Sequence, residues 1–204
     1  MDMTPHKGAA APSAGRAVGD RRLDGGDEVP VRRFVTIRGD IVDLAAESRP
    51  AHIQFRRFAG CPVCNVHLQG FVHRWSEVGP AVREIVLFHA EPEELQKHAG
   101  DLPFAVVADP RKAIYRAFGV EAGYRALGDP RAWPTILGSI AIAVPAVLAG
   151  RHHLPSRKPS GGRLGLPADF LVASDGNIVA RHYGAHAGDH WSVDDVLALA
   201  RRTG

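Results

Sequence analysis

The two cysteines of the chain, Cys61 and Cys64, have two residues between them, and their position between two elements constrains the fold more than any other feature. A strand-like run, residues 52–58, precedes them, and a run with helical spacing, residues 65–78, follows. A cysteine in the first turn of a helix has its thiolate stabilised by the positive helix end. A second cysteine one turn later can close a disulfide with it. The segment therefore predicts a redox-active dithiol with a lowered thiol pKa, in which Cys61 is the nucleophile and Cys64 resolves.

Two other interpretations of the cysteines stay open, namely a pair of inert buried thiols and half of a metal site. A structural zinc site needs two further ligands, and the chain has no second C-x-x-C motif. The histidines of the segment 182–190 lie among glycines after a strand, so we expect loop residues there and no metal. His67 follows Cys64 by about one helical turn, and we expect it to be a solvated helix residue rather than a proton donor. We expect no bound cofactor.

The bulk composition fits one domain with a sizeable core, since the chain has 204 residues, 45% hydrophobic and 23% charged. The formal charge of +3 is scattered along the chain and does not indicate nucleic-acid binding. Residues 1–30 are rich in alanine, glycine, proline and charge, which predicts a disordered leader. They lack the apolar run of a secretion signal, so we expect a cytoplasmic protein.

The order of the elements predicts an α/β fold with a central mixed sheet flanked by helices on both faces. Strands are expected at 33–37, 52–58, 84–89, 104–108, 169–173 and 177–183, and helices at 65–78, 92–99, 111–118 and 193–200. Asp109 should cap the third helix with Pro110 in its first turn, and Gly119 should end it. Residues 174–176 indicate a tight hairpin turn, and a capping box at Ser192 opens the last helix.

An insertion, residues 120–166, separates the third helix from the hairpin and contains an uncharged stretch at 132–150. We reject a membrane span there, because the strands before and after it should belong to one sheet and the stretch contains prolines. We expect a hairpin of short helices over the edge of the active site or against a second copy in a homodimer. The alternative is a peripheral contact with lipid helped by the basic run 151–158, for which a solvated loop is the simpler explanation.

Four segments resemble the thioredoxin superfamily, and within it the AhpC/TSA group, especially peroxiredoxin-like proteins with a C-x-x-C motif. They are FRRFAGCPVC (55–64), ADPRKAIYRAFGV (108–120), LPADFLVASDGNIVARHYG (166–184) and DHWSVDDVLALA (189–200). The resemblance implies a thioredoxin-like domain at residues 31–204, with the insertion before its C-terminal β-hairpin.

The segment around Cys61 departs from the peroxiredoxin pattern P-x-x-x-T-x-x-C. Phe58 stands where that pattern has its threonine, and Gln54 where it has its proline. Pro167 resembles instead the cis-proline that thioredoxin-type proteins place beside their C-x-x-C. Arg56 or Arg57 can serve as an anion-stabilising group, but only one of them can face the site in a strand. We expect Arg57, Phe58 and Pro167 to bind or activate the substrate.

The resemblance implies a thiol-dependent antioxidant enzyme that reduces organic hydroperoxides through a dithiol/disulfide cycle. An external dithiol protein, similar to thioredoxin or glutaredoxin, would restore the thiols. The first alternative is a protein disulfide reductase without peroxidase activity, which the missing threonine and proline and the presence of Pro167 favour. The second is a non-catalytic binding module whose cysteines hold a metal or support dimerisation.

Overall fold

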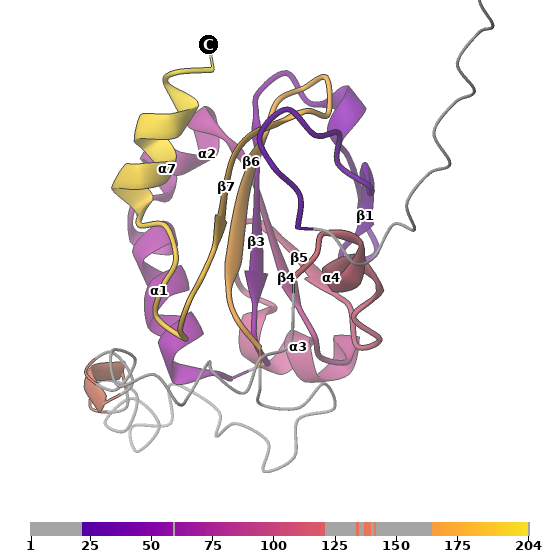
Figure 1. The fold of residues 1–204 in the computed structure, drawn as a ribbon. Coiled ribbons are helices and arrows are strands. Elements are labelled where there is room, and N and C mark those ends of the chain that lie inside the picture. Colours follow the sequence, from indigo (N-terminus) through magenta and orange to yellow (C-terminus); the bar gives the residue numbers. More distant parts are fainter. Residues whose placement is uncertain are drawn as a thin grey trace, which may run out of the picture.

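A mixed five-stranded sheet in the order β5-β4-β3-β6-β7 forms the centre of the structure, a computed structural model (Figure 1). It describes residues 22–58, 60–120 and 165–203, with a few positions between 134 and 141. The strands are β3 (Ala51–Arg56), β4 (Arg83–Phe88), β5 (Ala105–Ala108), β6 (Ala168–Val172) and β7 (Ile178–Tyr183). β3, β4 and β5 are parallel, whereas β6 and β7 run antiparallel to their neighbours. The predicted fold class is confirmed.

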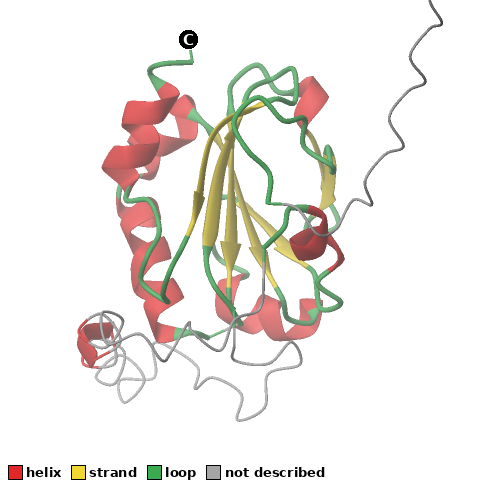
Figure 2. Ribbon diagram, viewed as in Figure 1, coloured by secondary structure: helices red, strands yellow, loops and turns green. Residues whose placement is uncertain are grey.

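Helices cover both faces of this sheet, as Figures 1 and 2 show. The helices are α1 (Pro62–His73), α2 (Trp75–Ala81), α3 (Pro92–Ala99), α4 (Ala113–Ala117) and α7 (Val193–Ala200). α1, α2 and α7 lie on one side of the sheet. On the other side lie α4 and a small antiparallel pair, β1 (Arg33–Val35) and β2 (Ile41–Asp43), followed by the short 3-10 helix η1 (Leu44–Ala46).

The strands alternate between two cores because successive side chains point to opposite faces of a sheet. Val86, Phe88 and Leu171 enter the core beneath α1, α2, α3 and α7. Ile85 and Phe170 enter the second core, beneath α4 and the β1–β2 pair. Both sets of side chains are almost fully buried, which explains why these runs read as continuous apolar strands in the sequence.

The C-terminal hairpin and helix form where the sequence predicts them. Gly176 has a φ of 89°, which the turn between β6 and β7 requires and glycine allows. Ser192 and Asp195 make the reciprocal bonds of a capping box at the start of α7. The predicted apolar face of α7 is buried and consists of Val193, Val196, Leu197 and Ala200.

The prediction of one helix at 65–78 is wrong, because two helices, α1 and α2, occupy this region and the chain bends between them at Arg74. The change of direction lets Val78 enter the core fully while the Trp75 ring packs against Phe104, with ring centroids 5.5 Å apart. Both side chains lie on α2, three residues apart and therefore on the same face of that helix. Sequence periodicity alone does not reveal such a bend.

The helix predicted to start at Arg111 begins later, at Ala113, after a turn in which Lys112 has a φ of 55°. The Asp109 carboxylate still caps it, since it accepts hydrogen bonds from the backbone N–H groups of Ala113 and Ile114 at 2.9 and 2.8 Å. Its predicted end is confirmed: Gly119 has a φ of 66° and closes a Schellman motif.

The first residues described by the structure are packed against the hairpin, although the composition placed them in the leader. The Leu23 N–H donates to the Tyr183 hydroxyl at 2.7 Å, and Glu28 forms a β-bridge with Asn177. Val29 is 4% exposed in the core beneath β1 and β2. The ordered part therefore starts before residue 31. Residues 1–21 lie outside the described residues, and a disordered leader there stays a prediction.

The predicted insertion at 120–166, with its apolar stretch 132–150, lies outside the described residues except for isolated positions. The predictions of a helical hairpin, a dimer contact and a lipid contact there remain predictions. Within the described part of the chain, no helix is both long and apolar enough to cross a membrane.

Candidate active site

The C-x-x-C motif lies where β3 gives way to α1, at the carboxyl edge of the parallel strands. Cys61 is the N-cap residue of α1, and Pro62 occupies the first helical position, where its missing N–H costs nothing. The two thiols are not bonded to each other, and the side chains are buried, with Cys61 1% and Cys64 5% exposed. Open α/β sheets place their ligand chemistry at this edge.

Arg57 is the cation of the motif. Its Nη2 donates a hydrogen bond to Cys61 Sγ at 3.0 Å, and the residue itself is 4% exposed. Arg56, one residue earlier, points to the opposite side, toward Asp169. Strand alternation thus gives the two arginines different environments, and Arg57 is the one beside the sulfur.

The pKa values of the two thiols are shifted in opposite directions. A hydrogen bond from Cys61 lowers the pKa of Cys64 to about 5 against the effect of burial, and the Arg57 guanidinium acts in the same direction. Burial, together with that hydrogen bond to Cys64, raises the pKa of Cys61 well above its usual range. The sequence placed the lowered pKa on Cys61, at the start of the helix. The two thiols are coupled, so the pair as a whole releases its first proton at a lowered pKa, which the Arg57 guanidinium favours.

Phe58 and Pro167, the other predicted site residues, lie at the same edge of the sheet. The buried Phe58 ring lies 5.8 Å from the Arg57 guanidinium carbon. Pro167 immediately precedes β6, whose first residue, Ala168, pairs with Phe55 of β3. No described peptide bond is cis, so the resemblance to a cis-proline is not met. The Pro167 carbonyl accepts the Gly184 N–H at 2.8 Å, which ties it to the sheet.

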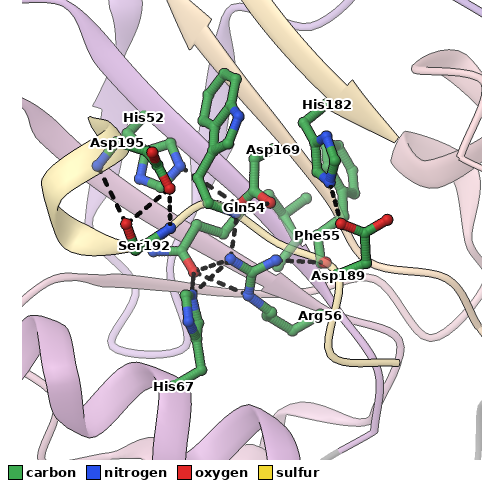
Figure 3. Close-up of polar contacts among 12 residues, drawn as sticks. His52, Gln54, Phe55, Arg56, His67, Asp169, His182, Asp189, Ser192 and Asp195 are labelled. Carbon is green, nitrogen blue, oxygen red and sulfur yellow. Dashed lines mark hydrogen bonds and ion pairs between the residues drawn. The ribbon is translucent and has the colours of Figure 1, made fainter. Parts of the chain in front are cut away.

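A buried polar network lies behind the motif, on the side of β3 that faces α1 and α7 (Figure 3). His52, Gln54 and Arg56 alternate along β3 and all point into it. Arg56 Nη2 lies 2.6 Å from Asp169 Oδ1, and His52 Nδ1 lies 2.8 Å from Glu84 Oε2. Gln54 donates to the same Glu84 carboxylate at 2.6 Å. The network ties β3 to both of its neighbouring strands.

Two cations and two carboxylates balance within this network, so each buried charge has a partner. Burial opposes protonation of His52, but Glu84 and Asp169 outweigh it and raise its pKa to about 9. The pKa of Asp169 is lowered far below its usual range, since Arg56 and His52 overcome the cost of its burial. His52 is therefore charged at neutral pH.

His67 joins this network, so the expectation of a solvated helix histidine is wrong. Arg56 Nη2 lies 2.9 Å from His67 Nε2, and the His67 ring lies 3.7 Å from the ring of His190. Burial and the charge of Arg56 lower the pKa of His67 well below its usual range, so it is neutral. His182 pairs with Asp189 at 2.9 Å. Among the described residues, no group of three or more histidine, cysteine, aspartate or glutamate side chains could hold a metal ion.

Sequence reasoning missed this network and also His89, which follows β4 at the same edge as the cysteines. Signals for both were present. Polar residues alternate along the run 52–56, which is otherwise apolar, and the buried run 84–89 ends in a histidine. Such alternation on a central strand indicates a polar face beneath the helices.

Comparisons with known proteins identify similar sequences and similar folds. The sequence model described as AhpC/TSA antioxidant enzyme matches residues 72–186, which leaves Cys61 and Cys64 outside the match. A search of curated proteins by sequence finds no match.

Solved structures of redox proteins share the fold at low sequence identity. Peroxidoxin BcpB from Mycobacterium tuberculosis is 15% identical with a TM-score of 0.57, over 90% of this chain and 99% of that one. The thiol peroxidase from Chromobacterium violaceum is 17% identical with a TM-score of 0.57, over 91% and 90%. A putative thiol:disulfide interchange protein DsbE from Chlorobium tepidum is 16% identical with a TM-score of 0.52, over 88% and 95%.

Proposed function

Because the chain belongs to the AhpC/TSA antioxidant enzyme family, we propose that it is a thiol peroxidase that reduces hydroperoxides through Cys61 and Cys64. The observation that carries the proposal is the contact of the Arg57 guanidinium with Cys61 Sγ at 3.0 Å. A cation at this place stabilises a thiolate, and it also stabilises the negative charge that develops on oxygen as an O–O bond breaks.

The chemistry starts from one thiolate and one thiol. Cys61 passes its proton to the Cys64 thiolate, and the Cys61 sulfur then attacks the terminal oxygen of the hydroperoxide. The O–O bond breaks, Cys61 becomes a sulfenic acid, and the departing alkoxide takes the proton back from Cys64 and leaves as an alcohol. The restored Cys64 thiolate attacks the sulfenic sulfur, forms the disulfide and releases hydroxide. An external dithiol protein then reduces the disulfide.

A second candidate is a protein disulfide reductase without peroxidase activity. It is favoured by Phe58, a side chain without a hydroxyl, at the place of the peroxiredoxin threonine. In this reaction Cys61 forms a mixed disulfide with the substrate, and Cys64 releases it.

The two candidates are separated by the rates at which the pre-reduced protein loses its thiols to cumene hydroperoxide and to the disulfides of insulin. We expect oxidation by the hydroperoxide to be orders of magnitude faster than that of a small free thiol, and the reaction with insulin to be slow. The reverse ratio would establish the reductase. The Arg57→Lys variant keeps a positive charge beside Cys61 but loses the planar guanidinium. We expect it to react with the hydroperoxide more slowly than the wild-type protein.

A further inference from the structure

His89 is a buried histidine without hydrogen bonds on its ring. It lies just beyond the end of β4 and is 1% exposed. Neither ring nitrogen has a hydrogen-bond partner within the described part of the chain. Leaving a buried polar group unpaired destabilises the fold, so such groups are rare without a functional reason. The structure thus keeps a polar side chain where an apolar one would be more stable.

The surroundings of His89 connect it to the cysteines. Its backbone N–H donates to the carbonyl of Arg57 at 3.3 Å, which continues the pairing of β3 with β4. A Cβ atom added to Gly165 would lie 3.1 Å from His89 Nε2 and 3.7 Å from Arg57 Cγ, so the bare backbone of Gly165 lies against both side chains. The Arg57 Nε–H is also buried without a partner among the described residues. The Nη2 of the same guanidinium contacts Cys61.

Burial and the nearby cations keep the His89 ring neutral. Burial lowers its pKa to about 4, and the nearby cations Lys112 and Arg57 act in the same direction. The ring of Tyr115 packs edge-on against it at 5.7 Å. A neutral imidazole offers one N–H donor and one nitrogen acceptor. Together with the Arg57 Nε–H, the group formed by Arg57, His89 and Gly165 presents two donors and one acceptor that are not used within the described protein.

We propose that His89 is a substrate-binding residue that, together with the Nε–H of Arg57, holds the hydroperoxide group of the substrate beside Cys61. A hydroperoxide has one O–H donor and two acceptor oxygens, which complements this set. The unprotonated ring nitrogen of His89 accepts a hydrogen bond from the O–H of the hydroperoxide. The ring N–H of His89 and the Nε–H of Arg57 donate to its two oxygens. A disulfide has no O–H and only weakly accepting sulfurs, so it leaves these groups unpaired. The subsite selects peroxide over disulfide and rests on the proposed peroxidase function.

The test compares His89→Leu with the wild-type protein in three measurements: thermal stability, alkylation of the thiols by iodoacetamide, and thiol oxidation by cumene hydroperoxide. Removing unpaired polar atoms should raise the melting temperature. Alkylation at neutral pH should stay unchanged, because the thiolate does not depend on His89. Oxidation by the hydroperoxide should slow by roughly tenfold to a hundredfold, as for the loss of one or two hydrogen bonds.

Two further variants and one control complete the experiment. His89→Gln keeps a donor and an acceptor and should recover part of the rate. Gly165→Ala should slow oxidation by placing a methyl group against His89 Nε2. His73→Leu, an exposed change of the same kind on α1, should leave the rate as it is.

The outcomes separate this inference from the function on which it rests. A wild-type protein oxidised no faster than a small free thiol would end the peroxidase proposal, and the subsite with it. A fast wild-type protein whose His89→Leu variant reacts equally fast would overturn the subsite alone. A variant that loses stability together with its rate would show that His89 has a structural role instead.

Discussion

Arg57 and Arg56 are adjacent in sequence, yet they have different tasks because a strand turns successive side chains to opposite faces. Arg57 lies against the thiols at the edge of the sheet, and Arg56 neutralises Asp169 beneath the helices. Replacing either one removes a buried cation, but only the loss of Arg57 should change the titration of the cysteines to a large extent. The two arginines therefore serve as matched sites for experiments on the thiol pKa.

The first prediction concerns the pH at which the dithiol loses its first proton. In the wild-type protein the thiolate should persist down to about pH 5, because the pKa of Cys64 is lowered to about 5. In Arg57→Leu this pKa should rise, since the guanidinium that favours the anion is gone, and Arg57→Lys should lie between the two. The ultraviolet absorbance of the thiolate, followed against pH, measures it. An unchanged titration in Arg57→Leu would remove Arg57 from the explanation.

Among the elements, β3 is the strand on which both the site and its support depend. Its carboxyl end leads into the segment with the two cysteines. One of its faces carries the polar network of His52, Gln54 and Arg56. Charges buried in balanced pairs add little stability by themselves, but removing one partner leaves the other uncompensated. The network should therefore make the stability of the fold depend on pH.

The second prediction follows from the raised pKa of His52. Its charge stabilises the fold fully below its unfolded pKa of 6.5, and this contribution is lost as the pH rises through its folded pKa of about 9. We expect a loss of about 3 kcal/mol between these limits. It should be measured by denaturant unfolding in a Cys61→Ser/Cys64→Ser background, because the lowered pKa of Cys64 acts in the opposite direction. A His52→Gln variant in that background should show a much flatter profile, and an equally steep one would contradict the assignment.

The third prediction concerns α7. Ser192→Ala removes the side chain that accepts the Asp195 N–H and should destabilise the protein by about 1 kcal/mol. Ser192→Asp should retain most of the stability, since aspartate is also a good N-cap. Thermal unfolding of the two variants measures the difference. Their thiol reactivity should equal that of the wild-type protein, because the exposed cap takes no part in the hydrogen bond between Arg57 and Cys61.

Elements with strong local signals could be predicted from the sequence, and features that depend on tertiary contacts could not. The turn at Gly176 and the cap at Ser192 are encoded within a few residues. The bend at Arg74 and the pKa shifts of the two buried thiols belong to the second group. The sequence predicts the motif and limits the neighbouring cation to Arg56 or Arg57, of which Arg57 contacts Cys61 in the structure. The network beneath the motif requires three strands to be in register.

For the whole molecule, the scaffold and the chemistry are supported by different parts of the chain. The family match covers residues 72–186, and the redox-protein structures share the fold along most of the length. The cysteines lie before the matched region, so the peroxidase assignment depends on the geometry around Cys61. At 15–17% sequence identity, these structures show the shared fold alone.

The fourth prediction concerns the apolar stretch 132–150, which the sequence predicts over the edge of the active site; we propose that in that position it favours organic hydroperoxides over hydrogen peroxide. The reduced protein should react faster with cumene hydroperoxide than with hydrogen peroxide, because an apolar aryl group gains contacts that hydrogen peroxide cannot make. Stopped-flow measurement of thiol loss gives both rate constants. Equal rate constants would remove the role proposed for this stretch and leave the chemistry of Cys61 untouched.

The proposed reduction of hydroperoxides by Cys61 is tested by the intact mass of reduced Cys64→Ser protein after brief exposure to cumene hydroperoxide. Without the resolving thiol, we expect the gain of a single oxygen atom, located on Cys61 as a sulfenic acid that a dimedone probe captures. The matched Cys61→Ser protein should gain none on the same timescale. Oxygen found on Cys64 in the Cys61→Ser protein, with none on Cys61 in the other, would reverse the roles of the two cysteines. No gain in either would contradict the claim that this chain reduces hydroperoxides.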